Sequence, residues 1–280
     1  MSVITSGFEP DAGTCDGINE KGLVASLLYL VESEYPPTSK VEKHPLLCVS
    51  AWAQYVLDNY ATVAEAVNSL SEEPFYVVAV TTPDGHPGTV HLAVSYPTGD
   101  SAIFEYIGGE LKIHHDRNYQ VMTNSPTYDQ QLALNAYWQQ IGGLIMLPGT
   151  NRAADRFVRA SFYINAIPDN PDSTEEAIAN AFSVIRNVSV PRGISVPGGE
   201  PNISSTLWRT VSDHKNKCYY FESTISPNVF WVDIADIDFA EGRSTKKLTL
   251  TNGTVFAGNV AAQFEPAEPF KFLEADGATT

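Results

Sequence analysis

Short apolar runs typical of strands alternate along the chain with apolar positions at helical spacing. Residues 2–7 have the pattern of a strand, and residues 22–30 form a mostly apolar run that predicts a strand buried on both sides. Apolar residues then recur at helical spacing and predict a helix over residues 45–60. Thr62 followed by Glu65 matches the capping box that begins a second helix.

The rest of the chain changes from strands to helices and back to strands. Four strand-like runs separated by turn signals predict an antiparallel meander, and three helical patterns follow, the last capped by Asp172 or Ser173. The meander strands are expected at residues 75–81, 89–96, 101–107 and 111–115, and the helices at about 127–140, 151–166 and 173–188. Further strands are expected at residues 206–211, 218–223, 229–234, 247–251 and 255–257.

This segregated order of elements predicts an α+β fold, with a layered αββα sandwich as one form, rather than a parallel α/β sheet. We expect one domain over residues 1–280, because no stretch is long enough to serve as an interdomain linker. No apolar run approaches the ~20 residues that cross a bilayer, so no membrane partner is expected.

Charge and cysteine content exclude several classes of function. The formal net charge is −16 and the basic residues are not clustered, which argues against a nucleic-acid partner. Cys15, Cys48 and Cys218 have neither zinc-site nor redox-pair spacing; Cys48 falls in the helical pattern and Cys218 in a strand pattern. His114 and His115 are neighbours on a predicted strand and would face opposite ways. We therefore expect no metal and no cofactor.

The stretch 121–131 contains the most informative corner of the chain. A strand-type run stops at Thr123, Asn124 and a Ser-Pro step follow, and a helical pattern begins. A rigid corner of this kind can aim the Asn124 side-chain NH₂ as an oxyanion donor. The same corner is also typical of a helix cap or an Asx turn, and the corner alone leaves both interpretations open.

Three arginines share one face of the helix predicted at residues 151–166. Arg152, Arg156 and Arg159 are spaced at helical intervals in an otherwise acidic protein. They could extend to the surface and pair with acidic residues. Alternatively, one of them polarises a buried site, where it holds a thiolate or a substrate oxygen.

Four motifs in this order resemble the choloylglycine hydrolase family, the linear amide C–N hydrolases that include penicillin V acylases and bile salt hydrolases. They are Asp-Gly-Ile-Asn-Glu-Lys-Gly-Leu at 16–23, Thr-Asn-Ser-Pro-Thr-Tyr-Asp at 123–129, Leu-Pro-Gly with Ala-Asp-Arg-Phe within 147–157, and Trp-Arg-Thr-Val-Ser-Asp-His-Lys at 208–215. The helical pattern around 51–58 is similar to that of penicillin V acylase-like proteins from Gram-negative bacteria. The resemblance covers essentially the whole chain.

The resemblance implies a four-layer αββα sandwich of the N-terminal nucleophile hydrolase type. In that family an N-terminal Cys attacks the amide carbon of a small-molecule N-acyl amide, and its own α-amino group moves the proton. By the match, Asn124 is the oxyanion-hole Asn and Arg156 the active-site Arg. Tyr29 falls where the second oxyanion donor lies, through its backbone N–H. Tyr at that position is common in penicillin V acylases, whereas bile salt hydrolases usually carry Asn.

The match also predicts an N-terminally truncated domain. Family members begin with the nucleophilic Cys and with strands bearing a further Arg and an Asp, and the chain matches from an interior strand onward. Cleavage before Cys15 would expose another N-terminal Cys, but the match places Cys15 in a loop. Without the inner strands, we expect the 280-residue chain to be poorly soluble or partly molten.

Several alternatives remain open at this stage. The chain could be a non-catalytic binding protein that keeps the acyl pocket, or a glycosidase-like enzyme that uses two carboxylates. Tyr29, Tyr128 and Trp138 could shape an acyl pocket or belong to the core. Phenoxyacetyl amides, N-acyl homoserine lactones and conjugated bile acids remain candidate substrates. The resemblance allows a homo-oligomer, commonly a homotetramer, and a periplasmic location if the full-length protein carries a signal peptide, otherwise a cytoplasmic one.

Overall fold

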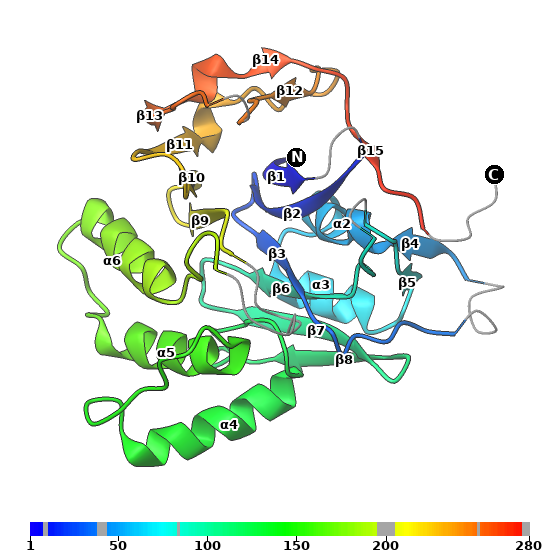
Figure 1. Ribbon diagram of the computed structural model, residues 1–280. Coiled ribbons are helices and arrows are strands. Elements are labelled where there is room, and N and C mark those ends of the chain that lie inside the picture. Colours follow the sequence, from blue (N-terminus) through cyan, green and yellow to red (C-terminus); the bar gives the residue numbers. More distant parts are fainter. Residues whose placement is uncertain (8–10, 38–43, 83–84, 195–204, 251–252, 276–280) are drawn as a thin grey trace.

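The structure is a computed structural model that describes residues 1–7, 11–37, 44–82, 85–194, 205–250 and 253–275. It has a mixed α+β fold built on a large, mainly antiparallel sheet with the strand order β1-β2-β3-β6-β7-β8 (Figure 1). β15 adds to this sheet in parallel beside β2. The strands are β1 (Ser2–Gly7), β2 (Asp11–Asn19), β3 (Val24–Tyr29), β6 (Val90–Ser95), β7 (Ser101–Ile107), β8 (Glu110–His115) and β15 (Lys271–Phe272).

A smaller sheet has the order β13-β11-β10-β9. Its strands are β9 (Trp208–Asp213), β10 (Cys218–Ser223), β11 (Val229–Asp233) and β13 (Gly258–Asn259). Two further strand pairs complete the β structure, β4 (Leu46–Cys48) with β5 (Tyr76–Val78), and β12 (Lys246–Lys247) with β14 (Glu265–Pro266). Short 3-10 helices lie at Val49–Ala51 (η1), Ile234–Asp236 (η2) and Ala261–Gln263 (η3).

The layers follow from which apolar faces meet. α2 (Trp52–Asn59) and α3 (Val63–Leu70) cover one face of the large sheet, where helix residues such as Trp52 and Val56 pack against Leu92 and Phe104. On the opposite face, Ile18 packs against Phe221 and other residues of the small sheet. α6 (Thr174–Asn187) lies against β9, so the order of layers is α2–α3, large sheet, small sheet, α6 (Figure 1).

α4 (Tyr128–Ile141) and α5 (Ala153–Ala166) form a helix pair beside β7 and β8 (Figure 1). Ile103 of β7, Tyr128 of α4 and Phe157 of α5 form a separate buried cluster that fixes this pair on the large sheet. The segment between β8 and α4 is therefore held at the end of the sheet, and it contains the corner at Asn124.

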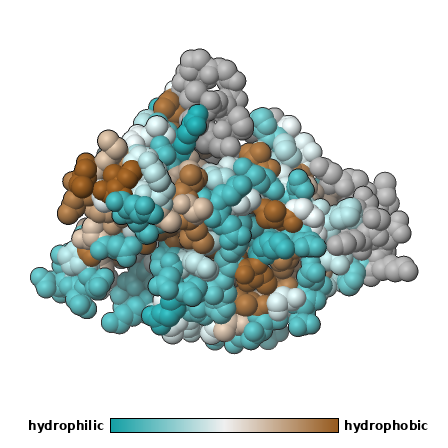
Figure 2. All heavy atoms as spheres, turned by 90° about the horizontal axis from the view of Figure 1, so that it is seen from below, coloured by the Kyte–Doolittle hydropathy of each residue, from teal (hydrophilic) through white to brown (hydrophobic). Residues whose placement is uncertain are grey.

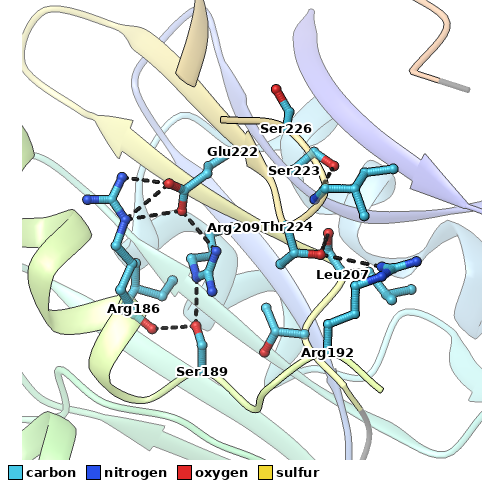
Figure 3. A network of polar contacts seen from close by, with 12 residues as sticks. Arg186, Ser189, Arg192, Leu207, Arg209, Glu222, Ser223, Thr224 and Ser226 are labelled. Atoms are coloured by element: carbon cyan, nitrogen blue, oxygen red, sulfur yellow. Dashed lines mark hydrogen bonds and ion pairs between the residues drawn. The ribbon is translucent and has the colours of Figure 1, made fainter. Parts of the chain in front are cut away.

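A polar network joins α6 to the small sheet (Figure 3). The Glu222 carboxylate accepts from Arg186 Nη2 at 2.6 Å and from Arg209 Nη1 at 2.9 Å, and Arg209 Nε donates to Ser189 Oγ at 2.7 Å. Burial raises the pKa of Glu222, but the hydrogen bonds and charges of the two arginines outweigh it and lower the pKa overall. The network fixes the helix against β9, which carries the Trp-Arg-Thr-Val motif, and against β10, which carries Glu222.

Most locally encoded elements are confirmed. β1, β6, β7, β8, β9, β10, β11, α4, α5 and α6 lie at the predicted places within a few residues. Thr62 Oγ1 accepts from Glu65 N and Ser173 Oγ from Glu176 N, as the predicted caps require. The predicted strand at 247–251 is reduced to β12, and its last residue lies outside the described residues.

Four predictions about the fold are wrong. Residues 45–60 do not form one helix, because Leu46–Cys48 pairs as β4 with the distant β5 before η1 and α2 begin. β5 consequently leaves the meander, which contains β6, β7 and β8 only. β3 is only partly buried along much of its length rather than buried on both sides. The strand expected at 255–257 is absent from the described chain, and β13 begins at Gly258 instead.

β2 was missed, because the sequence of residues 11–19 favours turns. A Cβ at Gly17 would lie 2.5 Å from the Val3 carbonyl oxygen, so the glycine allows β1 and β2 to approach closely. Cys15 therefore lies in a paired strand, not in a loop as expected.

The lower face of the molecule, the side of α4 in Figure 1, is mostly hydrophilic and carries separate hydrophobic patches (Figure 2). The loop after α4 exposes Leu144, Ile145 and Met146, the first of them by 95%. Tyr137 of α4 is also exposed. Within the described residues, no helix is long and apolar enough to cross a membrane.

Candidate active site at the Asn124 corner

Asn124, Arg156 and Tyr29 meet at the corner before α4, although they are widely separated in sequence. Asn124 Nδ2 donates to the Tyr29 carbonyl oxygen at 2.8 Å. Arg156 Nη2 donates to Asn124 Oδ1 at 2.7 Å, and Arg156 Nε donates to the Asn151 carbonyl oxygen at 3.1 Å. The structure thus brings together all three residues that the sequence singled out.

The Asn124 side chain is held at both ends. Its Oδ1 accepts from the guanidinium, which fixes which end of the amide is oxygen and which is nitrogen. One Nδ2 hydrogen is used by the Tyr29 carbonyl, and the amide carries a second hydrogen that this bond leaves for another acceptor. An amide held in this way is a pre-oriented hydrogen-bond donor.

The backbone N–H of Tyr29 is directed away from β6. In an antiparallel pair, opposed residues alternate between bonded and non-bonded pairs. Leu30 N donates to the Thr89 carbonyl oxygen, so the next pair inward, Tyr29 with Val90, is non-bonded. Val90 N indeed donates to Tyr35 Oη instead. The Tyr29 N–H and C=O therefore share the other edge of β3, where Asn124 lies.

The arginine cluster divides into separate roles. Burial and the neighbouring charge of Arg159 lower the pKa of Arg156 to about 10, which leaves it protonated near neutral pH. Arg159 is buried and donates from Nη1 to the carbonyl oxygens of Pro148 and Thr150, each at 2.8 Å. Arg156 and Arg159 thus bind amide and carbonyl oxygens rather than surface acids.

A buried cluster of ionisable side chains lies at the start of α4, and the sequence analysis did not predict it. Glu105 of β7 is 1% exposed; His91 Nδ1 lies 2.9 Å from its Oε1 and His114 Nε2 lies 3.4 Å from its Oε2. The N–H of Tyr128 donates to both carboxylate oxygens at 3.1 Å. Glu105 thereby accepts from the first N–H of α4, at Tyr128, four residues after Asn124. An acidic residue in the otherwise uncharged and mostly apolar strand Ser101–Ile107 was the signal that could have revealed it.

Burial raises the pKa of Glu105, but hydrogen bonds from His114, His91 and the Tyr128 N–H outweigh it and lower the pKa to about 2. Glu105 is therefore ionised at neutral pH and complements the positive end of the α4 dipole. The predicted opposition of the two histidines is confirmed, since His115 faces away and pairs with Asp100 at 2.8 Å. Among the described residues, no group of three or more His, Cys, Asp or Glu could hold a metal ion.

The aromatic candidates for an acyl pocket separate. Tyr128 is a core residue, 1% exposed, packed against Phe157 and His114. Trp138 lines a groove of about 390 Å³ between α4 and α5. Tyr29 is the one whose carbonyl oxygen accepts from Asn124 Nδ2.

A larger groove of about 830 Å³ reaches Met122, which precedes Asn124 by two residues in the sequence. It is lined by Met122, by Ile103 of the large sheet, by Ile178 of α6 and by Val211 of β9. Within the described residues β9 pairs with β10 only, so its other edge is open along this groove.

The chain is similar to known proteins over nearly its whole length. Residues 3–248 match the model of the linear amide C–N hydrolases, choloylglycine hydrolase family. A penicillin V acylase from Pectobacterium atrosepticum is 55% identical over 97% of this chain and 77% of its own length. A bile salt hydrolase/transferase from Clostridium perfringens is 30% identical over 78% of this chain and 72% of its own.

The structure of penicillin V acylase from Agrobacterium tumefaciens is 56% identical and superposes with a TM-score of 0.88, covering 97% of this chain and 82% of that one. Both the family match and the shared fold span most of the chain, including β3, the Asn124 corner and α5. The chain therefore belongs to the choloylglycine hydrolase family of linear amide C–N hydrolases.

Proposed function

We propose that the protein is a penicillin V acylase-like amidase, which hydrolyses the linear amide C–N bond of a small-molecule N-acyl substrate. The observation that carries the proposal is the Asn124 amide, held between Arg156 and the Tyr29 carbonyl with the Tyr29 N–H on the same strand edge. Two pre-oriented N–H donors at one point are what acyl transfer requires for its tetrahedral oxyanion.

The reaction proceeds through a thioester. A cysteine thiolate attacks the amide carbon, and the carbonyl oxygen becomes an oxyanion that accepts from Asn124 Nδ2 and the Tyr29 N–H. The α-amino group of the cysteine has taken up the thiol proton as the thiolate formed; the intermediate collapses with cleavage of the C–N bond, and this proton passes from the ammonium to the leaving amine. Water then attacks the thioester through a second oxyanion, which releases the carboxylic acid and restores the thiol.

Arg156 orients and polarises the oxyanion donor. Its guanidinium withdraws electron density from Asn124 Oδ1, which makes the Nδ2 hydrogens stronger donors. Its positive charge also favours an oxyanion and a thiolate nearby.

The nucleophile in this proposal is an N-terminal cysteine outside the printed 280 residues. Burial, followed by the charge of Asp16, raises the pKa of Cys15 to about 12, and burial raises that of Cys218 to about 11. Neither thiol supplies thiolate at neutral pH. Cys48 lies in β4, in the pair with β5. The open edge of β9, which borders the 830 Å³ groove, would accept a further strand that brings the cysteine toward Asn124.

These cysteines also favour a second function for the 280-residue chain by itself, namely ligand binding without turnover. Isothermal titration with penicillin V, combined with an assay for released amine, separates the two. Binding without release is expected of the 280-residue chain, and turnover by it would contradict the proposed origin of the nucleophile.

The hydrolase proposal is tested on the full-length protein, translated with the in-frame sequence encoded upstream of Met1. Penicillin V, a conjugated bile acid and an N-acyl homoserine lactone are supplied in turn, and free amine is measured. We expect release from penicillin V to exceed release from the bile acid, in line with Tyr at position 29. A stop codon directly upstream of Met1, or no release from any of the three amides, would refute the proposal.

We further propose that the protein forms a homo-oligomer through the α4 face. Residues 130–151 contain no charged side chain, whereas the whole chain carries a net charge of −16, so two copies meet with least repulsion here. The exposed Leu144 and Ile145 would be buried by such contact. Sedimentation velocity should show a shift toward the monomer in Ile145→Asp; an unchanged species would reject this face.

A further inference from the structure

Gln131 in the first turn of α4 binds the backbone of the Asn124 corner. Its side chain is 0% exposed. Nε2 donates to the Asn124 carbonyl oxygen at 2.5 Å and to the Pro126 carbonyl oxygen at 2.6 Å. Oε1 accepts from Thr123 Oγ1 at 2.8 Å. Both amide hydrogens and one oxygen lone pair are thus used on the stretch 123–126.

These bonds are not needed to form the helix itself. Gln131 N donates to the Thr127 carbonyl oxygen in the ordinary first turn of α4, independently of the side chain. The first helical N–H, that of Tyr128, is satisfied by Glu105. The Gln131 side chain is therefore directed back at the corner and leaves the helix ladder unaffected.

The Asn124 residue is consequently held from two sides. Its side chain lies between Arg156 and the Tyr29 carbonyl, and its backbone is fixed by Gln131. Ser125 Oγ adds a contact by accepting from Val31 N at 3.3 Å, two residues beyond Tyr29. Loss of the Gln131 amide would leave two carbonyl oxygens of the corner without this partner, and the corner would move to find others.

We propose that Gln131 is a positioning residue for the oxyanion donor Asn124, an inference that rests on the proposed amidase function. A donor aimed at a developing oxyanion loses its effect when displaced by about 1 Å, which can reduce the rate by ~10²-fold. Substrate binding depends on other surfaces, so the displacement changes kcat rather than KM.

The variants that test this are Gln131→Met, which keeps the length and removes every hydrogen bond, and Gln131→Glu, which keeps the acceptor for Thr123 but places oxygen against two carbonyls. Gln130→Met is the matched control, since Gln130 is exposed on the same helix. In the full-length enzyme we expect Gln131→Met to lower kcat by about 10- to 100-fold with KM within threefold, Gln131→Glu to lower it at least as much, and Gln130→Met to leave both unchanged.

A double-mutant cycle with Asn124→Ala separates positioning from general damage to the fold. If Gln131 acts through Asn124, Gln131→Met lowers kcat no further in the Asn124→Ala background. An equal fall in both backgrounds, or an unchanged kcat in Gln131→Met while Asn124→Ala loses activity, would overturn the inference. Full activity in Asn124→Ala would instead refute the oxyanion role on which it rests.

A second measurement needs no turnover and is made on the full-length protein. Hydrogen–deuterium exchange is followed in the peptide 121–131 of wild type, Gln131→Met and Gln130→Met. We expect exchange in this peptide to be about tenfold faster in Gln131→Met alone, with the peptides of α6 unchanged. Equal exchange in all three proteins would overturn the inference whether or not the protein proves to be an amidase.

Discussion

Glu105 and Asp16 are two carboxylates of the same large sheet that differ in their hydrogen-bond donors. Glu105 faces α4 and forms hydrogen bonds with two histidine side chains and a backbone N–H. These bonds lower its pKa to about 2 in spite of burial. Asp16 faces the small sheet and receives the hydroxyls of Tyr219 and Thr210. Burial raises the pKa of Asp16, and these hydroxyl bonds do not reverse it.

The difference shows how the hydrogen-bond donors act against burial: at Glu105 they outweigh it and lower the pKa, and at Asp16 they do not, so the pKa is raised. Imidazole and helix N-terminal N–H groups stabilise the charge, whereas hydroxyls are satisfied almost as well by a neutral acid. Glu105 supports the helix that carries the proposed oxyanion corner. Asp16 joins the two sheets and has no contact with that corner among the bonds described.

Removal of Glu105 should have the largest effect. Glu105→Ala leaves His91, His114 and the Tyr128 N–H without their buried acceptor, so we expect the free energy of unfolding to fall by about 3–5 kcal/mol. Urea unfolding of the full-length protein measures it. Glu110→Ala on the exposed part of β8 is the control, and a loss for Glu105→Ala as small as that of the control would contradict the account.

The pH dependence should differ in sign between the two carboxylates. The folded pKa of Glu105 is below its ordinary value of 4.5, so its contribution is present above pH 4.5 and is lost as the pH falls toward about 2. The folded pKa of Asp16 is above its ordinary value of 3.8, so its contribution is present below that pH and is lost as the pH rises through the folded pKa.

Thermal unfolding between pH 2 and 7 checks both signs. The difference between wild type and Glu105→Gln should shrink on acidification, and that between Asp16→Asn and wild type should grow as the pH rises above 3.8. Parallel curves for the three proteins would show that neither carboxylate is linked to folding as described.

Asp16→Asn should have the smallest effect. An amide can still accept from one hydroxyl and donate to the other, and it carries no charge to desolvate. At pH 7 we expect the free energy of unfolding to change by no more than about 1 kcal/mol, toward greater stability. A loss comparable to that of Glu105→Ala would remove the contrast between the two sites.

The sequence predicted elements whose signals are local. Thr62 with Glu65 and Ser173 with Glu176 lie within one helical turn, and both caps are confirmed. By contrast, β4 forms because it pairs with β5 some thirty residues later, and no pattern within 45–60 records that partner. The glycines of β2 made its sequence look like a turn, whereas Gly17 is needed for the close approach of β1.

The candidate site divides in the same way. Asn124, Arg156 and Tyr29 were proposed through motifs, and the structure joins them by hydrogen bonds across 95 and 32 residues. The residues that support the corner, Gln131 and Glu105, were not proposed. Each looked like an ordinary position of a helix or a strand, and its role depends on where a distant segment lies.

The most direct measurement of the central claim is kcat of Asn124→Ala in the full-length protein, with penicillin V as substrate and Asn118→Ala, an exposed asparagine, as the control. Removal of one oxyanion donor should lower kcat by about 10²–10³-fold while the thermal transition and the control rate stay unchanged. A kcat equal to that of wild type would contradict the assignment of Asn124 as the oxyanion donor.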